Sequence, residues 1–250
     1  MRRWLLPLGL IMLLLGLWQV ASSTGAIADA LNLESYLAPS PAEIATSLWE
    51  NRALLAENAW VTLREILLGI LCALAVGIGF AIAMHRWQLI RDAAYPLVVA
   101  SQTIPIIVIA PILIVWFGYG ITPKIVIVAL ICFFPITVNA LDGLRSVDPE
   151  AVKMMRTLNA SRWQLFWRLE APASLPSLFT GIKISVVVAP IAAVFAEWVG
   201  SEAGLGRLIQ SDTAYYLVDR QFAAVAVLAA MALALIGLTA LVERRVVRWR

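Results

Sequence analysis

The sequence is short of charged residues. Only 14% of its 250 residues are Asp, Glu, Lys or Arg, whereas soluble domains usually carry about 25%. Hydrophobic residues make up 62%, and the mean hydropathy is +0.87. A soluble fold with this composition would lack the polar side chains to cover its surface, and a disordered chain would need far fewer apolar ones. The composition therefore argues against a soluble globular enzyme and excludes disorder.

Residues that bind metals or form disulfides are also scarce. Cys72 and Cys132 both fall inside apolar segments, no Cys-x-x-Cys pair occurs, and His85 is the only histidine. We therefore expect no metal site. The phosphate-binding pattern G-x-x-x-x-G-K-[S/T] is absent, so no nucleotide site is expected on this chain. One histidine and scattered carboxylates make a membrane enzyme a poor hypothesis, and no catalytic residue is predicted.

Long stretches of the sequence contain no charge. A helix needs about 20 apolar residues to cross a bilayer. Five uncharged segments reach or approach this length. A sixth apolar segment is interrupted only by Lys183 and Glu197. We predict an all-α, polytopic membrane protein with one domain over residues 1–250 and spans near 4–27, 64–84, 94–117, 124–141, 177–199 and 221–242. The first segment also fits a cleavable signal peptide, because two arginines precede it and Ala26-Ile27-Ala28 follows.

The distribution of Lys and Arg predicts the orientation of these spans. With the N-terminus in the cytoplasm, the inner segments carry 13 of these residues and the outer segments carry 5. Lys183 lies early in the fifth span, where it could extend to the cytoplasmic interface. We therefore expect both termini in the cytoplasm. This bias accounts for the net charge of +3, which then indicates no nucleic-acid partner.

The third span is interrupted by prolines, each of which removes a helix hydrogen bond and predicts a kink: Pro96, Pro105 and Pro111. Gln102 and Thr103 lie beside the middle proline. They could hydrogen-bond a passing solute or tie two helices together. Asn139 and Glu197 are further pathway candidates, because polar and ionisable groups inside a membrane are costly and often functional.

Two capping-box patterns predict helix starts outside the inner loop. Ser40-Pro41-Ala42-Glu43 offers a capping serine, a proline at the first helical position and a glutamate at the third. A helix over about 41–57 should follow. Thr62-Leu63-Arg64-Glu65 repeats the pattern and is expected to open the second span.

The inner loop, residues 142–176, is predicted to form two short helices. Asp148-Pro149-Glu150 is a strong helix start, and Asn159 suits the left-handed residue that ends a helix. Ser161-Arg162-Trp163-Gln164 is a capping box for a second helix, which Pro172 and Pro176 are expected to end. The apolar side chains of these helices need a partner, which could be the bilayer surface or a cytoplasmic protein.

This loop resembles the EAA loop of the permease subunits of ATP-binding-cassette importers. The family pattern is roughly E-A-A, three residues, G, nine residues and I-x-L-P. Here it falls on Lys153-Met154-Met155, Asn159 and Leu169-Glu170-Ala171-Pro172. The spacing is intact, but Lys153 replaces the Glu and Asn159 replaces the Gly. Lys153 reverses a charge thought to contact the ATPase, whereas Asn159 keeps the left-handed turn at a modest steric cost.

Further segments resemble the nitrate/sulfonate/taurine-type group of these permeases, so that the resemblance covers nearly the whole chain. They are residues 38–41, 62–64, 104–105, 110–120, 197–200 and 204–206. The segments 102–105, 133–139, 155–167 and 197–200 are most similar to permeases assigned to thiamine-precursor pyrimidines. The resemblance implies the type I importer permease fold with six transmembrane helices.

The resemblance also implies a function and partners. The chain would form the pathway for a small polar solute in a bacterial inner membrane, without being an enzyme or binding a cofactor itself. Its expected partners are a second permease copy in a homodimer, two cytoplasmic ATPase subunits that bind ATP and Mg²⁺, an external solute-binding protein and the bilayer. The solute could be a pyrimidine thiamine precursor or a nitrate-, sulfonate- or taurine-type anion. A secondary transporter is the alternative from another class.

The matching positions supply the candidate site residues. The ATPase-coupling set could contact the ATPase or, in part, only hold the shape of the loop; it is Lys153, Met155, Arg156, Leu158, Asn159, Ala160, Ser161 and Arg162. The candidate pathway residues are Gln102, Thr103, Asn139 and Glu197.

Overall fold

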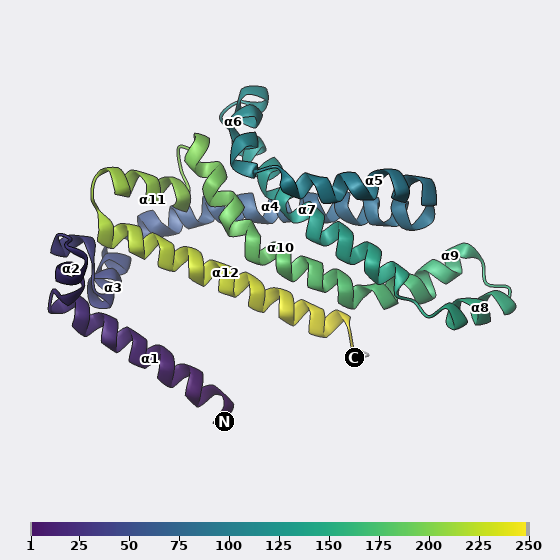
Figure 1. Ribbon diagram of the computed structural model, residues 1–250, viewed down its shortest axis with the longest axis horizontal. Helices are drawn as coiled ribbons and strands as arrows, with labels where there is room; N and C mark the ends of the chain where they lie inside the picture. The colour runs from purple at the N-terminus through teal and green to yellow at the C-terminus, as the bar shows by residue number, and fades with distance from the viewer. Residues whose placement is uncertain (1, 249–250) are drawn as a thin grey trace. The chain divides into compact units, whose positions relative to one another are not determined.

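A computed structural model describes residues 2–248, with the side chains of residues 2–5, 7, 8 and 107 left aside. Every regular element in that range is helical, which confirms the predicted all-α class (Figure 1). The elements are α1 (Arg2–Ser23), α2 (Ala26–Leu31), η1 (Ser35–Leu37), α3 (Pro41–Glu50), α4 (Arg52–Arg86), α5 (Gln88–Ala100), η2 (Ser101–Thr103), α6 (Ile106–Phe117), α7 (Ile121–Arg145), α8 (Pro149–Thr157), α9 (Arg162–Leu165), the π-helical turn η3 (Phe166–Glu170), α10 (Ala171–Gly200), α11 (Leu205–Ala214) and α12 (Val218–Val246).

The chain divides into two compact units. The first holds the residues up to Val61 together with Ala203–Ala229, and the second holds Thr62–Glu202 together with the residues from Ala230 onward. A single domain with both termini in the cytoplasm stays a prediction.

In the first unit, the capping box at Ser40 is present as predicted. The backbone N–H of Glu43 donates to the Ser40 hydroxyl at 3.3 Å, and Glu43 Oε2 accepts from the Ser40 N–H at 2.7 Å. The helix ends at Glu50 and not near residue 57, because the Asn51 side chain donates to the Ser47 carbonyl at 3.0 Å. Such a side-chain bond competes with the helical pattern, and α4 begins one residue later.

A buried ion pair joins α11 to the start of α12 in the same unit. Arg220 donates from Nε and Nη2 to the two carboxylate oxygens of Asp212, at 3.0 and 2.6 Å. Asp212 is fully buried, and this two-point geometry is the strong form of a carboxylate–guanidinium pair. Asn58 Oδ1 also accepts from the Gly204 N–H at 2.8 Å, which ties the first turns of α4 to the residue before α11.

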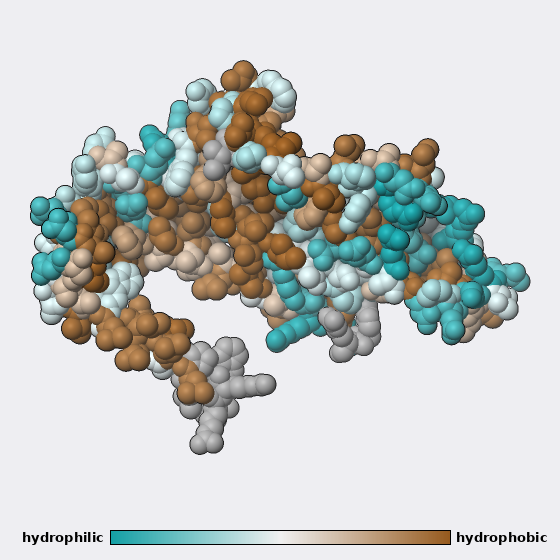
Figure 2. Space-filling view, viewed as in Figure 1, coloured by the Kyte–Doolittle hydropathy of each residue, from teal (hydrophilic) through white to brown (hydrophobic). Residues whose placement is uncertain are grey.

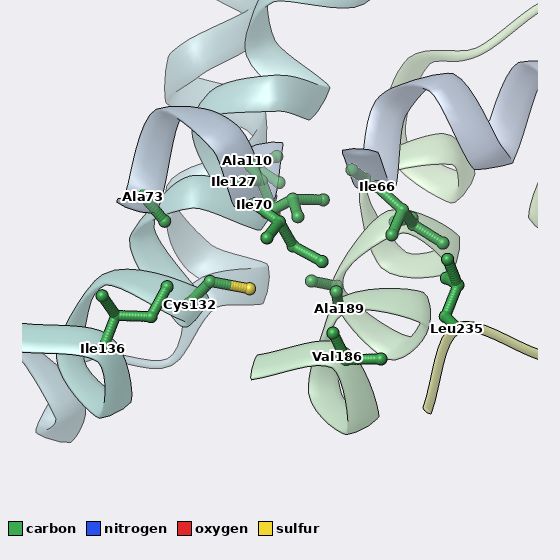
Figure 3. Close-up of a cluster of buried hydrophobic side chains, with 14 of the residues drawn as sticks. Ile66, Ile70, Ala73, Ala110, Ile127, Cys132, Ile136, Val186, Ala189 and Leu235 are labelled. Carbon is green, nitrogen blue, oxygen red and sulfur yellow. The ribbon is translucent and has the colours of Figure 1, made fainter. Parts of the chain in front are cut away.

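The second unit contains a large hydrophobic cluster. Side chains from α4, α6, α7, α10 and α12 meet there, and Figure 3 shows Ile70, Ile127 and Ala189 among them. Two glycines allow the close approach of these helices. A Cβ at Gly69 of α4 would lie 2.5 Å from Val128 Cβ, and a Cβ at Gly181 of α10 would lie 2.5 Å from the Pro135 carbonyl oxygen. Both distances are too short for real atoms, so α7 packs against bare backbone on two sides.

Four helical stretches are long and apolar enough to cross a membrane: Arg52–Arg86, Ile121–Arg145, Arg162–Gly200 and Val218–Val246. Two further helices, Gln88–Thr103 and Val108–Phe117, are long and apolar enough to cross a membrane only when taken together. Gly9–Ser23 is a shorter apolar helix. The six predicted spans overlap these helices, but a count of six stays a prediction.

The third predicted span is broken more sharply than kinks at its prolines would require. Its two helices are bent by 106° at a break of at most four residues. Pro105 precedes the first residue of α6, where its missing N–H breaks no helical bond. The turn η2 lies just before it and carries Gln102 and Thr103. These two residues therefore lie in the last turn of the first helical stretch, next to the corner of the backbone.

The end of the second inner helix was also predicted wrongly. Pro172 and Pro176 do not end the second inner helix, because α9 continues through η3 into α10. Pro172 lies just after the π-helical turn, and Pro176 lies inside α10. The π-helical turn changes the hydrogen-bond register just before Pro172, which allows the chain to remain helical.

Polar and apolar surfaces are separated within the second unit. Figure 2 shows hydrophilic side chains gathered at the end of this unit that carries α8 and α9, while apolar side chains cover its middle, around α6 and α10. The short inner helices thus lie outside the apolar body of the unit.

Candidate functional site

The α8–α9 hairpin, residues 148–165, is closed by a left-handed turn at Asn159. Asn159 has a φ of 56°, its N–H donates to the Arg156 carbonyl at 2.9 Å, and the Ala160 N–H donates to the Met155 carbonyl at 3.0 Å. These two bonds form a Schellman motif, which satisfies the last carbonyls of a helix. The predicted left-handed end of this helix is therefore confirmed.

Both helices of the hairpin begin with the predicted side-chain caps. Asp148 Oδ1 accepts from the Glu150 N–H at 2.8 Å. The Ser161 hydroxyl accepts from the Gln164 N–H at 3.2 Å, and Gln164 Oε1 accepts from the Ser161 N–H at 2.8 Å. Because each end is capped by its own residues, the hairpin keeps its shape without needing a core of its own.

The predicted coupling residues lie along this hairpin. Met155 and Ala160 are half-buried, and the others are exposed: Lys153, Arg156, Leu158, Asn159, Ser161 and Arg162. Leu158 stands beside the turn with 71% of its surface exposed, although it is a large apolar residue. Exposed apolar side chains on a capped, protruding element are typical of a surface that binds another protein.

The base of the hairpin is anchored by residues that sequence reasoning did not select. His85, near the end of α4, lies with Nε2 3.1 Å from Glu170 Oε2 in η3. Trp163, Phe166 and Trp167 form an aromatic group with ring centroids 5.4 to 6.4 Å apart. The available signal was that His85 is the only histidine and that Glu170 falls within the last letters of the EAA pattern.

Of the four pathway candidates, Gln102 lines a cavity. This open cavity of about 640 Å³ lies among α4, α5, α6 and α7. Its aromatic wall is formed by Phe80 and Phe133, whose rings meet edge to face with centroids 5.8 Å apart. Ser101 and Gln102 are the polar side chains in its lining, which contains no charged residue. The Ser101 hydroxyl donates to the Val98 carbonyl at 2.7 Å and can then only accept, so Gln102 is the polar lining side chain that can both donate to a solute and accept from it.

The other two uncharged candidates make local bonds. The Thr103 hydroxyl donates to the Ala100 carbonyl at 2.8 Å, and the Asn139 side chain donates to the Pro135 carbonyl at 2.8 Å. Asn139 faces α10, since a Cβ at Gly181 would lie 3.0 Å from its Cβ. The structure thus does not bring Asn139 to the cavity that Gln102 lines.

Glu197 lies in a buried polar cluster with Thr62, Glu65 and Lys124. Its side chain is fully buried, and the Thr62 hydroxyl donates to its Oε1 at 2.6 Å. Glu65 hydrogen-bonds Glu197 through its side chain, and Lys124 interacts electrostatically with Glu65. Lys124 and Glu65 keep only 6% and 1% of their surface exposed. The cluster joins α4, α7 and α10, away from the cavity of Gln102.

Sequence reasoning missed this cluster because it interpreted Thr62–Glu65 as a helix start. Both residues instead lie inside α4, which begins ten residues earlier than Thr62. Their spacing of three places both side chains on one face of the helix, and that face is buried.

Lys183 has a partner that was not expected. Its ammonium group forms an ion pair with Glu243 of α12, and 39% of its side chain is exposed.

Within residues 2–248 no three His, Cys, Asp or Glu residues gather closely enough to hold a metal ion.

Comparison with known proteins identifies relatives over most of the chain. It is 38% identical over 233 residues, 93% of each chain, to a probable ABC transporter permease protein of Haemophilus influenzae. It is 41% identical over 174 residues to the formylaminopyrimidine transport permease protein ThiX of Halalkalibacterium halodurans, covering 69% of this chain and 70% of the relative. It is 32% identical over 204 residues to the taurine transport system permease protein TauC of Escherichia coli, covering 81% and 71%.

The fold also matches a solved transporter structure. An inward-facing structure of the MetNI methionine ABC transporter contains a chain that superposes with a TM-score of 0.68 at 18% identity, covering 79% of this chain and 98% of that one. This match confirms the type I importer permease fold. The family model for binding-protein-dependent transport system inner membrane components matches residues 65–248. With that model covering most of its length, the chain belongs to the family of binding-protein-dependent transport system inner membrane components.

Proposed function

We propose that two copies of this chain form the solute pathway of an importer, and that the α8–α9 hairpin of each copy docks on one of two cytoplasmic ATPase subunits. Family membership makes the chain a multi-pass inner-membrane permease subunit and not an enzyme, and it decides against a secondary transporter. Such permeases work with an ATPase and an external solute-binding protein. ATP and Mg²⁺ then bind on the ATPase, and a homodimer is the simplest arrangement of the permease.

The exposed Leu158 beside the closed turn is the observation that carries the docking proposal. A hairpin that is capped at both helix starts and at its turn can transmit a push from its tip to its base. Its base continues through η3 into α10, which packs in the core of the second unit. A movement imposed on the tip would therefore reach a helix that crosses the membrane.

The docking proposal predicts that Leu158→Asp separates the permease from its ATPase. We expect recovery of the ATPase with the tagged permease to fall about ten-fold, because a carboxylate would replace an apolar anchor that is desolvated on docking. Co-purification from gently solubilised membranes measures this. Leu89→Asp is the matched control, since Leu89 is also highly exposed but lies on α5. Unchanged ATPase recovery in the Leu158 variant would contradict the proposal.

For the solute, we propose an uncharged, planar, heteroaromatic molecule. The cavity lined by Gln102 offers two aromatic side chains for ring contacts and one amide that can both donate and accept hydrogen bonds. An anion such as nitrate, a sulfonate or taurine would need a positive group, and no lining residue carries one. A pyrimidine fits this chemistry, in agreement with the name of the ThiX relative.

This assignment predicts the outcome of competition and substitution experiments. Excess formylaminopyrimidine should abolish uptake by cells that express the complete system, whereas excess taurine should leave it unchanged. Phe80→Ala should lower uptake about ten-fold, because an aromatic contact and its buried area are lost. Phe195→Ala is the control: Phe195 packs on Trp198 and does not line the cavity. Competition by taurine alone would overturn the solute class while leaving the importer function intact.

A further inference from the structure

A second open cavity, of about 810 Å³, lies between the end of α4 and the base of the α8–α9 hairpin. We name it the arginine cavity, because Arg86, Arg156 and Arg162 all line it. Its remaining walls include Trp87, Trp163 and Phe166, so that positive charge and aromatic surface are combined. It shares no lining residue with the cavity that Gln102 lines.

Among the described residues, no acidic side chain neutralises the three guanidinium groups of the arginine cavity. None of them forms an ion pair or hydrogen bond with any other side chain of residues 2–248. Glu170 is the single acidic residue in the lining, and it is paired with His85 at 3.1 Å. Three guanidinium groups against one carboxylate leave the lining with an excess of positive charge, which favours a bound anion.

A neighbouring cavity shows the opposite arrangement. Arg91 and Arg145 line an open cavity of about 350 Å³ together with Asp92 and Asp142. There the two arginines are matched by two carboxylates within the lining, and Arg91 Nε lies 3.4 Å from Asp92 Oδ1. The chain thus balances arginines in one cavity and leaves them unbalanced in the other.

We propose that the arginine cavity binds a phosphate-bearing anion, supplied by the headgroup of an anionic phospholipid. Guanidinium groups bind phosphate oxygens through two parallel hydrogen bonds, and three of them can surround one headgroup. Basic pockets between transmembrane helices are known to hold such headgroups.

The position of the cavity favours a lipid over a soluble phosphate. Arg86 is the last residue of α4, a helix long and apolar enough to span the membrane, and Trp87 follows it directly. Tryptophan is enriched at the level of lipid headgroups, and Trp87 is more than half exposed. A lipid bound here would contact Arg156 and Arg162 of the hairpin, and its headgroup would hold the hairpin against the end of α4.

Lipid titration of the detergent-purified complete transporter, followed by native mass spectrometry, tests the proposal. Phosphatidylglycerol is compared with phosphatidylcholine of the same chain length and with glycerophosphate, which carries the phosphate without the acyl chains. We expect phosphatidylglycerol to bind about ten-fold more tightly than phosphatidylcholine, and Arg86→Gln to weaken its binding about five-fold. Arg86→Lys should retain most of the affinity, and Arg91→Gln should change nothing.

The possible outcomes separate the sources of the anion. Selective phosphatidylglycerol binding that depends on Arg86 and resists glycerophosphate supports a lipid site. Competition by millimolar glycerophosphate would support the phosphate chemistry but overturn the lipid source. Equal binding of the two lipids, or equal effects of the Arg86 and Arg91 variants, would overturn the proposal. Loss of the ATPase in Arg86→Gln without any change in lipid binding would also overturn it, in favour of an acidic segment of the ATPase.

Discussion

Valine in place of Asn159 is expected to lower solute uptake about ten-fold in cells that carry the complete transporter. Asn159 has a φ of 56°, and a left-handed conformation costs an ordinary residue about 1–2 kcal/mol, with β-branched side chains at the unfavourable end. That cost acts against the two hydrogen bonds that close the α8–α9 hairpin. The equilibrium constant between the closed and the open hairpin, on which coupling to the ATPase depends, should fall by a factor of about 5 to 30.

Two further variants test whether the effect belongs to the hairpin. Asn159→Gly should retain uptake, because glycine adopts the left-handed conformation without strain. Asn32→Val places the same strain in the first unit, where Asn32 ends α2 with a φ of 52°. Asn32→Val should lower the thermal stability about as much as Asn159→Val does. It should leave the recovery of the ATPase with the tagged permease unchanged. Full uptake by the Asn159→Val transporter would show that this turn does not carry the coupling.

The sequence predicted well those structural features that depend only on residues close together in the chain. The caps at Ser40, Asp148 and Ser161 are all present, because each is made between residues two or three positions apart. The left-handed turn at Asn159 is equally local. The shape of the α8–α9 hairpin, and the set of residues along it, therefore follow from the amino-acid sequence alone.

The features that sequence predicted poorly depend on residues that are distant in the chain. Thr62 and Glu65 matched a capping box, but they lie in mid-helix because Glu197, more than 130 residues away, is their partner. Pro172 was expected to end a helix, yet the preceding π-helical turn accommodates it. A local pattern shows what a segment can form, and the packing of α4, α7 and α10 decides which possibility is used.

The candidate site follows the same division. Gln102 could be selected because a proline break beside polar residues is a local signal, and it does line a cavity. Glu197 could be identified as an ionisable residue in an apolar segment, but its surroundings could not be predicted. Its buried partners come from two other helices. The role of Glu197 in a pathway stays a prediction, whereas its place in a polar cluster suggests a structural role that stability measurements can test.

Replacing Lys124 with methionine is expected to destabilise the folded protein by about 3–5 kcal/mol, the usual cost of leaving a buried charge uncompensated. Glu65 and Glu197 bring two carboxyl groups together in this buried cluster, and Lys124 supplies a positive charge that offsets them. Methionine has a similar length without the charge, so the cluster would retain an uncompensated negative charge away from water. Thermal unfolding of the purified protein and its yield as a monodisperse species measure the effect.

The explanation by charge balance can be separated from a simple loss of packing. Glu65→Gln should have little effect, because its amide N–H can donate to the Glu197 carboxylate while Lys124 still offsets the charge of that carboxylate. Combining Lys124→Met with Glu65→Gln and Glu197→Gln gives a neutral cluster of similar volume, and it should recover most of the lost stability. Lys183→Met is the matched control, since its pair with Glu243 is partly exposed and should cost less than about 1 kcal/mol. If the triple variant were as unstable as Lys124→Met alone, packing around Lys124 would decide the stability of this region, and the carboxyl pair would have to be balanced in another way.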